Sequence, residues 1–216
     1  MLSARSLLAL VFVGLAIGAG ARSIPAYQGG LTDNQHSVAP EEVARTLAAN
    51  GQAFALPRAN GKVKYNVAKD AKRFSLVSGE TPVALFKLSD YRAPYELAIR
   101  SLCKCLGVAK EFFVPTVLLL DGDFRVTRTL HETDFVAKQA SWSRPMNLET
   151  IVVIDDAGAS ERYLLVFTDP RWVGSNVIII NQIHVGALGG ARYTSSFPFG
   201  KGALKGTLEL EVGSKK

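Results

Sequence analysis

The 216-residue chain has few of the side chains that most enzymes and metalloproteins depend on, with only two cysteines and three histidines. His36, His131 and His184 have no spacing that would bring two of them to one face of a helix or strand. The chain contains no Gly-x-Ser-x-Gly elbow, no phosphate-binding glycine loop and no His-Glu-x-x-His helix. We therefore predict no enzymatic activity, no cofactor and no metal site.

Two pairs of acidic residues do not change this prediction. Asp121/Asp123 and Asp155/Asp156 could act as a general acid and base, or could ligate calcium. Each pair also borders a glycine in an expected turn, where aspartate is common for conformational reasons. We therefore predict no catalytic residues.

The chain also lacks blocks of like charge and apolar runs long enough to cross a membrane comfortably. Its 25 Lys and Arg outnumber 19 Asp and Glu, but they are scattered singly, so no nucleic-acid surface is predicted. At the N-terminus, Arg5, the apolar run Leu7–Ile17 and Ala19-Gly20-Ala21 have the order of a signal peptide cleaved after Ala21. A retained membrane anchor is the alternative. Cleavage removes only Arg5 among the charged residues, leaving 24 basic and 19 acidic residues in an exported protein with no stable membrane insertion.

The two cysteines, Cys103 and Cys105, stand in the sequence Lys-Cys-Lys-Cys. Two interpretations of their redox state remain open: a strained, redox-labile bridge, or free or partly oxidised thiols in a loop. Two thiolates cannot complete a zinc site. One intervening residue also differs from the two that thioredoxin-type chemistry usually needs, so neither interpretation predicts an oxidoreductase.

What the chain has in quantity is short apolar, β-branched stretches separated by turn residues. The clearest is Phe112–Leu120, which we expect to be one buried strand. Asp121-Gly122-Asp123 should then form a hairpin turn in which Gly122 adopts a positive φ. Pro115 has no N–H to donate, so it should lie at an edge, at a bulge or at the first residue of the pairing.

Similar patterns predict the rest of a β-rich fold. Further strands are expected over Phe74–Val77, Val83–Leu88, Tyr95–Ser101, Thr150–Ile154, Arg162–Thr168, Asn176–Val185 and Leu204–Val212. We expect one hairpin within Gln52–Asn66 and a second between Thr150–Ile154 and Arg162–Thr168, with surface loops over Leu130–Leu148 and Tyr193–Gly202. Strands joined by short turns without helices between them predict a mainly β fold, an antiparallel β-sandwich of jelly-roll type.

One short amphipathic helix is expected before the strands. It should begin at Pro40-Glu41-Glu42 and end at Asn50-Gly51, with Val43 and Leu47 on one face. A single short helix is not stable alone, so it should dock onto the β-domain or onto a partner. The predicted organisation is a signal peptide over 1–21, a flexible arm and the helix over 22–51, and the sandwich over 52–216.

The order of the apolar segments resembles that of the maltose operon periplasmic protein family. The similarity lies in TPVALFKLSDYRAPYELAIRS, FFVPTVLLLDGDF, RYLLVFTDP and the closing LKGTLELEV, and it runs in register over Ala71–Pro170. Asn176–Val185 departs from the family, in which we expect a more polar connector with prolines. The resemblance implies a non-enzymatic periplasmic accessory protein of maltose and maltodextrin transport. Its partners would be maltodextrin or components of the uptake system, an outer-membrane porin or periplasmic transport proteins. The alternative is an exported envelope scaffold that binds another protein through its helix and arm.

If the protein binds sugar, the candidate residues are aromatic and arginine side chains in predicted loops. A flat aromatic face packs against the apolar side of a sugar ring, and arginine donates hydrogen bonds to hydroxyls. The alternative is that each tryptophan plugs an end of the sandwich. The candidate ligand-binding residues are Trp142, Trp172, Arg144, Arg171, Tyr91 and Tyr193.

Overall fold

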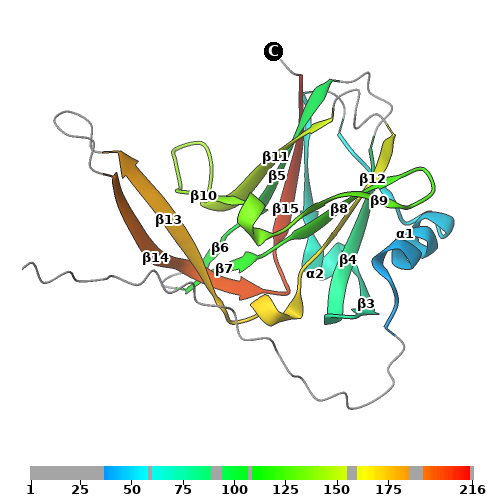
Figure 1. Ribbon diagram of the computed structural model, residues 1–216, viewed down its shortest axis with the longest axis horizontal. Coiled ribbons are helices and arrows are strands. Elements are labelled where there is room, and N and C mark those ends of the chain that lie inside the picture. The colour runs from blue at the N-terminus through cyan, green and yellow to red at the C-terminus, as the bar shows by residue number, and fades with distance from the viewer. Residues whose placement is uncertain are drawn as a thin grey trace, which may run out of the picture. The chain divides into compact units, whose positions relative to one another are not determined.

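The computed structural model describes residues 37–57, 60–88, 94–106, 109–154, 160–184 and 192–214. The expected signal peptide, most of the expected arm, His36, Tyr91 and the Asp155/Asp156 pair lie outside these residues. The described part of the chain is mainly β, as predicted, and its strands form three sheets (Figure 1).

The first sheet, sheet A, contains six strands in the order β1-β4-β12-β8-β9, with β3 pairing with β4. All its pairings are antiparallel except that of β1 with β4. Its strands are β1 (Phe54–Ala55), β3 (Lys72–Leu76), β4 (Gly79–Lys87), β8 (Thr116–Asp121), β9 (Val126–Leu130) and β12 (Glu161–Phe167).

The second sheet, sheet B, contains five antiparallel strands in the order β10-β11-β5-β15-β2. Its strands are β2 (Lys62–Asn66), β5 (Tyr95–Leu102), β10 (Val136–Lys138), β11 (Asn147–Ile154) and β15 (Thr207–Ser214). The last strand in the sequence, β15, therefore lies inside the sheet between β5 and β2.

Sheets A and B pack face to face around one hydrophobic core. Alternate side chains of each strand point into this core, so Leu119 and Leu164 of sheet A meet Leu97, Ile99 and Leu210 of sheet B, all of them fully buried. Two sheets with a shared core are what the predicted sandwich requires, and its jelly-roll connectivity stays a prediction. The face of sheet B that points away from this core carries the polar side chains.

Helix α1 (Pro40–Ala49) covers the other face of sheet A. Proline occupies the first turn, and Gly51 adopts φ 65° just beyond the last residue, so the helix begins and ends where the sequence predicts. Val43, Ala44 and Leu47 are buried against apolar residues of β3, β4, β8 and β12. The helix thus docks onto the β-domain, one of the two expected outcomes. The short helices are α2 (Val67–Asp70) and the 3-10 helices η1 (Glu132–Asp134) and η2 (Pro170–Trp172).

A third sheet, sheet C, was not predicted. Its order is β13-β14-β7-β6, and its strands are β6 (Lys104–Leu106), β7 (Ala109–Phe113), β13 (Asn176–His184) and β14 (Arg192–Ala203). The strand expected over Asn176–Val185 is present, but Tyr193–Gly202, expected to be a loop, is its hairpin partner. Pro198 is tolerated there because it lies at a register shift in the pairing. At Gly202 a Cβ would lie 2.0 Å from the carbonyl oxygen of Trp172, so only glycine fits.

The central hairpin differs from the prediction in two respects. Phe112–Leu120 is not one strand, because the chain leaves sheet C after β7 and enters sheet A at β8, directly after Pro115. In the turn, the residue with positive φ is Phe124 (φ 62°), and Gly122 is not among the residues with positive φ. The Phe124 ring stacks on Tyr163 with centroids 4.6 Å apart, and this packing compensates for a conformation that a bulky residue rarely adopts.

Two predicted hairpins are wrong. Within Gln52–Asn66, β1 belongs to sheet A and β2 to sheet B, and β11 and β12 are likewise divided between the two sheets. In each case two consecutive strands belong to different sheets. A local sequence pattern does not show to which sheet a strand belongs. The expected loop Leu130–Leu148 contains η1 and β10, which pairs with β11. The strands expected over Phe74–Val77, Val83–Leu88, Tyr95–Ser101 and Leu204–Val212 are confirmed, with shifts of a few residues at their ends.

None of the helices within the described residues has the length and apolar character needed to cross a membrane.

Candidate functional site

The solvent side of sheet B carries a row of charged residues of alternating sign. Glu149 on β11, Arg100 on β5, Glu209 on β15 and Lys64 on β2 stand directly opposite one another across four strands. They point away from the core because their sequence neighbours point into it. We call this surface the charged face and define it by Lys62, Lys64, Arg100, Lys138, Glu149, Glu209 and Glu211.

Arg100 is the centre of the charged face. It is only 5% exposed, and its guanidinium binds three carboxylates: Nε donates to Glu149 Oε1 at 2.6 Å, Nη1 donates to Glu209 Oε1 at 3.3 Å, and Nη1 also donates to Glu211 Oε2. Burial lowers the pKa of Arg100, but the hydrogen bonds to Glu211 and Glu149 outweigh this effect and raise it. Arg100 is therefore a permanent positive charge that holds the three acids together.

Glu211 is the accessible acid of this group. Its side chain is 35% exposed, whereas those of Glu149 and Glu209 are almost buried. The hydrogen bond from Arg100 lowers the pKa of Glu211 against the opposing effect of burial, and the positive charges of Arg144 and Lys62 lower it further. Glu211 is thus a carboxylate near neutral pH, with one edge facing solvent.

The β10–β11 hairpin ends beside the charged face. Its tip is a tight turn in which Ser141 N donates to Arg144 O at 2.8 Å, and Trp142 lies within this turn, fully exposed. Arg144 ends this turn, and the positive charge of its guanidinium helps to lower the pKa of Glu211. The turn therefore presents a free aromatic face together with a hydrogen-bond donor whose charge acts on an acceptor of the charged face.

Trp172 and Arg171, the second predicted pair, are engaged in local structure. Arg171 Nε donates to Asp169 Oδ2 at 2.7 Å, and Asp169 Oδ1 accepts the Arg171 backbone N–H at 2.9 Å. Trp172 is half-buried against the cluster of Phe112, Val114 and Leu148. This environment matches the alternative role, in which the tryptophan closes one end of the core.

The remaining candidate residues fall in other settings. Tyr193 lies in β14 opposite Ile183. Asp121 Oδ1 accepts the N–H groups of Asp123 and Arg125 at 2.8 and 2.9 Å, which is the turn role proposed for this pair. Among the described residues, no group of three or more His, Cys, Asp or Glu side chains could hold a metal ion.

The acids of the charged face were not singled out from the sequence. In LKGTLELEV, Glu209 and Glu211 alternate with inward leucines, and this pattern is typical of any solvated strand face. Arg100 is 109 residues from Glu209 and 49 from Glu149. Only the strand order could have shown that a single arginine binds all three carboxylates.

The pH dependence of stability tests the Arg100–Glu211 interaction. Because the folded-state pKa of Glu211 lies below its ordinary value of about 4.3, its contribution should be present above that value and lost as the pH falls below it. Glu211→Gln should therefore be less stable than wild type at pH 7, and the difference should shrink as the pH falls below about 4. Urea midpoints of both proteins across this range measure the effect. A difference independent of pH would contradict the assignment.

A family model described as maltose operon periplasmic protein precursor (MalM) matches residues 78–212. The match spans β4 to β15 and includes Arg100, Trp142, Arg144 and the three acids of the charged face. A comparison with curated proteins gives no match.

Proposed function

Because this chain belongs to the maltose operon periplasmic protein family, we propose that it is a non-enzymatic periplasmic accessory protein of maltodextrin uptake. Membership supports a periplasmic location and an association with the maltose operon. In this proposal a signal peptide cleaved after Ala21 delivers the protein. The antiparallel sandwich, whose jelly-roll-like connectivity stays a prediction, serves as a rigid scaffold for the hairpin tip.

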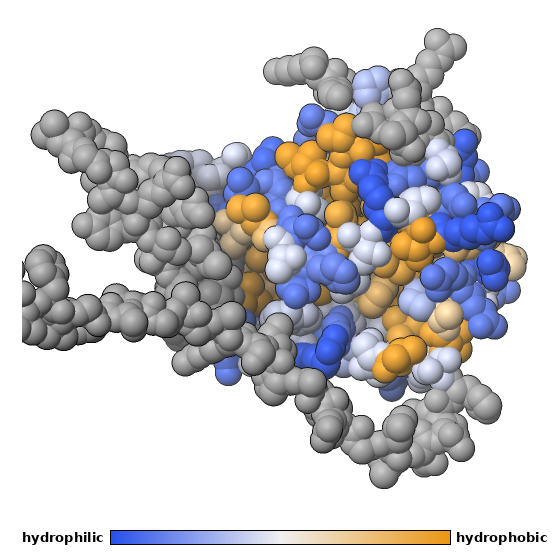
Figure 2. Space-filling model, viewed as in Figure 1, coloured by the Kyte–Doolittle hydropathy of each residue, from blue (hydrophilic) through white to orange (hydrophobic). Residues whose placement is uncertain are grey.

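The observation that carries the sugar-binding role is the full exposure of Trp142 in one turn with Arg144, whose positive charge acts on Glu211. The apolar face of a glucose unit can pack on the exposed indole, as sugar rings do on aromatic side chains. Its hydroxyls both donate and accept, so they match the Arg144 guanidinium and the solvent-facing edge of Glu211. Figure 2 shows apolar patches of the described residues interspersed with hydrophilic side chains on the viewed face.

The electrostatics of the charged face support binding without catalysis. A glycosidase needs one carboxylic acid with a raised pKa that can give a proton to the leaving group. Here Arg100 binds Glu149, Glu209 and Glu211, and it lowers the pKa of Glu211. An acid that stays ionised can accept hydrogen bonds from hydroxyls but is a poor proton donor at neutral pH.

Titration with maltohexaose tests the proposal. Trp142→Ala should weaken binding about tenfold, equivalent to about 1.4 kcal/mol, because the stacking surface is lost. Its melting temperature should stay close to that of wild type, since an exposed side chain contributes little to stability. The matched control is Trp172→Ala, which should lower the melting temperature because the half-buried ring is part of a core cluster.

If wild type does not bind maltohexaose at millimolar concentration, direct sugar recognition is wrong. The alternative, an envelope scaffold that binds another protein, would then gain weight. Helix α1 does not suit this alternative, because its apolar face is already buried against sheet A. A protein contact would use Val136 and Ile151, which are exposed beside the charged face. Co-purification with an outer-membrane porin or with periplasmic transport proteins would support it.

A further inference from the structure

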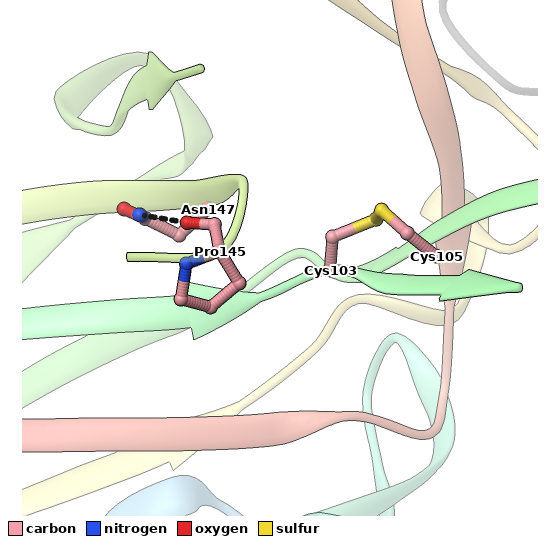
Figure 3. The surroundings of a disulfide bond; sticks show 4 residues. All are labelled: Cys103, Cys105, Pro145 and Asn147. Carbon is pink, nitrogen blue, oxygen red and sulfur yellow. Dashed lines mark hydrogen bonds between the residues drawn. A yellow bond between two sulfur atoms is a disulfide. The ribbon is translucent and has the colours of Figure 1, made fainter. Parts of the chain in front are cut away.

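The structure joins Cys103 and Cys105 in a disulfide at the corner where β5 of sheet B ends and β6 of sheet C begins. Their Cα atoms are 5.3 Å apart, with only Lys104 between them. Figure 3 shows both side chains on the same side of the chain, with Pro145 and Asn147 near Cys103. The bridge therefore closes a very small ring at the junction of two sheets.

The two sulfur atoms of this bridge have different surroundings. Cys103 is half-buried, packs against the cluster of Phe112, Val114 and Leu148, and donates its N–H to Met146 O at 2.9 Å. Cys105 is exposed on β6, the last strand in the order of sheet C. A reagent in solution therefore meets Cys105 first.

One cationic side chain stands across from the exposed cysteine. Lys110 on β7 is directly opposite Cys105 and is exposed. Lys104 precedes Cys105 in the strand, so its side chain points to the other face, where its Nζ lies 3.8 Å from a carboxylate oxygen of Glu111. A positive charge near a cysteine favours the thiolate, which is the form that takes part in disulfide exchange.

The bridge contributes little to holding the fold together. A disulfide stabilises mainly by restricting the unfolded chain, and this effect is smallest for the shortest loops. Neither cysteine belongs to the main core between sheets A and B or to the core under helix α1. The bond can therefore open and close while the sandwich remains folded.

We propose that the Cys103–Cys105 bridge is a site of reversible thiol–disulfide exchange with dithiol proteins of the periplasm. A thiolate of the partner attacks Sγ of Cys105, the S–S bond breaks, and the electron pair moves to Sγ of Cys103, which takes a proton from water. The partner's second thiolate then attacks the partner's own sulfur in the mixed disulfide, that S–S bond breaks, and Cys105 leaves as a thiolate opposite Lys110. The partner dithiol is oxidised to a disulfide, and this chain is reduced by two electrons. Each bridge reacts with one partner dithiol and is not regenerated in the same reaction. The exchange therefore does not make this protein an enzyme, in agreement with the proposed function.

Single-cysteine variants test the asymmetry of the site. Cys103→Ser leaves Cys105 as a free thiol, and Cys105→Ser leaves Cys103. At pH 7, Cys103→Ser should react with 5,5′-dithiobis(2-nitrobenzoic acid) at least about tenfold faster, because its thiol is exposed and stands opposite Lys110. Adding Lys110→Gln to Cys103→Ser should slow the reaction several-fold, whereas adding Lys104→Gln should change the rate little, because Lys104 pairs with Glu111. Equal rates for the two single variants would overturn the proposal.

Reduction of the wild-type protein distinguishes between two roles of the bridge, reversible exchange and stabilisation of the fold. Dithiothreitol in native buffer should reduce the bridge completely, as counted from alkylated cysteines by intact mass, while the circular dichroism spectrum stays unchanged. Removing dithiothreitol and adding oxidised glutathione should restore the bridge. A bond that is reduced only in urea, or reduction that unfolds the protein, would show that the bridge has a structural role instead.

Discussion

Replacing Arg100 with methionine should lower the free energy of unfolding by about 3–5 kcal/mol, because the change removes the only buried counter-ion described for two almost buried carboxylates. Without Arg100, Glu209 and Glu149 keep only ion pairs at 3.9–4.0 Å with lysines whose side chains are mostly exposed. Methionine fills much of the same volume, so the loss reports charge compensation more than packing. Urea denaturation monitored by tryptophan fluorescence measures it.

Two control variants distinguish the contribution of the buried Arg100 to stability from that of the exposed charges. Lys64→Gln removes a cation 3.9 Å from Glu209, but its side chain is 59% exposed, so the cost should be at most about 1 kcal/mol. Combining Arg100→Met with Glu149→Leu and Glu209→Leu should recover much of the stability, since apolar residues often replace a buried ionic group without loss. If Arg100→Met alone keeps the wild-type urea midpoint, the carboxylates are solvated and the assigned role of Arg100 is wrong.

Leu119→Ala should lower the free energy of unfolding by about 2–5 kcal/mol, the usual cost of a cavity left by a buried leucine. Leu119 is fully buried on β8, paired with Leu164 of β12, and its side chain belongs to the core that both sheets share. The neighbouring strands are fixed by their hydrogen bonds, so the space cannot collapse completely. The change in urea midpoint measures this cost.

The matched control for Leu119→Ala is an exposed residue of the same chemical kind. Val77 is 84% exposed in the turn between β3 and β4, so Val77→Ala should change stability by less than about 0.5 kcal/mol. If both variants unfold at the wild-type midpoint, the packing of sheet A against sheet B is wrong.

Local patterns predict the elements of this fold better than their pairing. Helix α1 is predictable because Pro40 and Asn50-Gly51 mark its ends, and β5 because its large apolar residues recur at every second position, at Tyr95, Leu97 and Ile99. The pairing of β11 with β5, and of β12 with β4 and β8, depends on which sheet each strand enters. Which sheet a strand enters depends on the burial of apolar side chains from both sheets together. No short segment of the sequence contains that information.

The candidate site likewise combines residues that the sequence identifies with residues that only the fold brings together. The sequence identified Trp142 and Arg144 by residue type, and gave Trp172 the same weight because both tryptophans lie in predicted loops close to an arginine. The structure distinguishes them by environment, since one indole is exposed and the other packs on a core cluster. The acids of the charged face come from β11 and β15, so only the folded sheet brings them together around Arg100.

The central position of β15 in sheet B affects when the chain can fold. Strands β5 and β2 both pair with Thr207–Ser214, more than 100 residues later in the chain, so sheet B stays incomplete while synthesis is under way. Closing such long loops is slow compared with forming local turns. A chain whose last residues are still being synthesised therefore lacks the strand that joins β5 to β2. The two halves of sheet B can combine only after almost the whole polypeptide has been made.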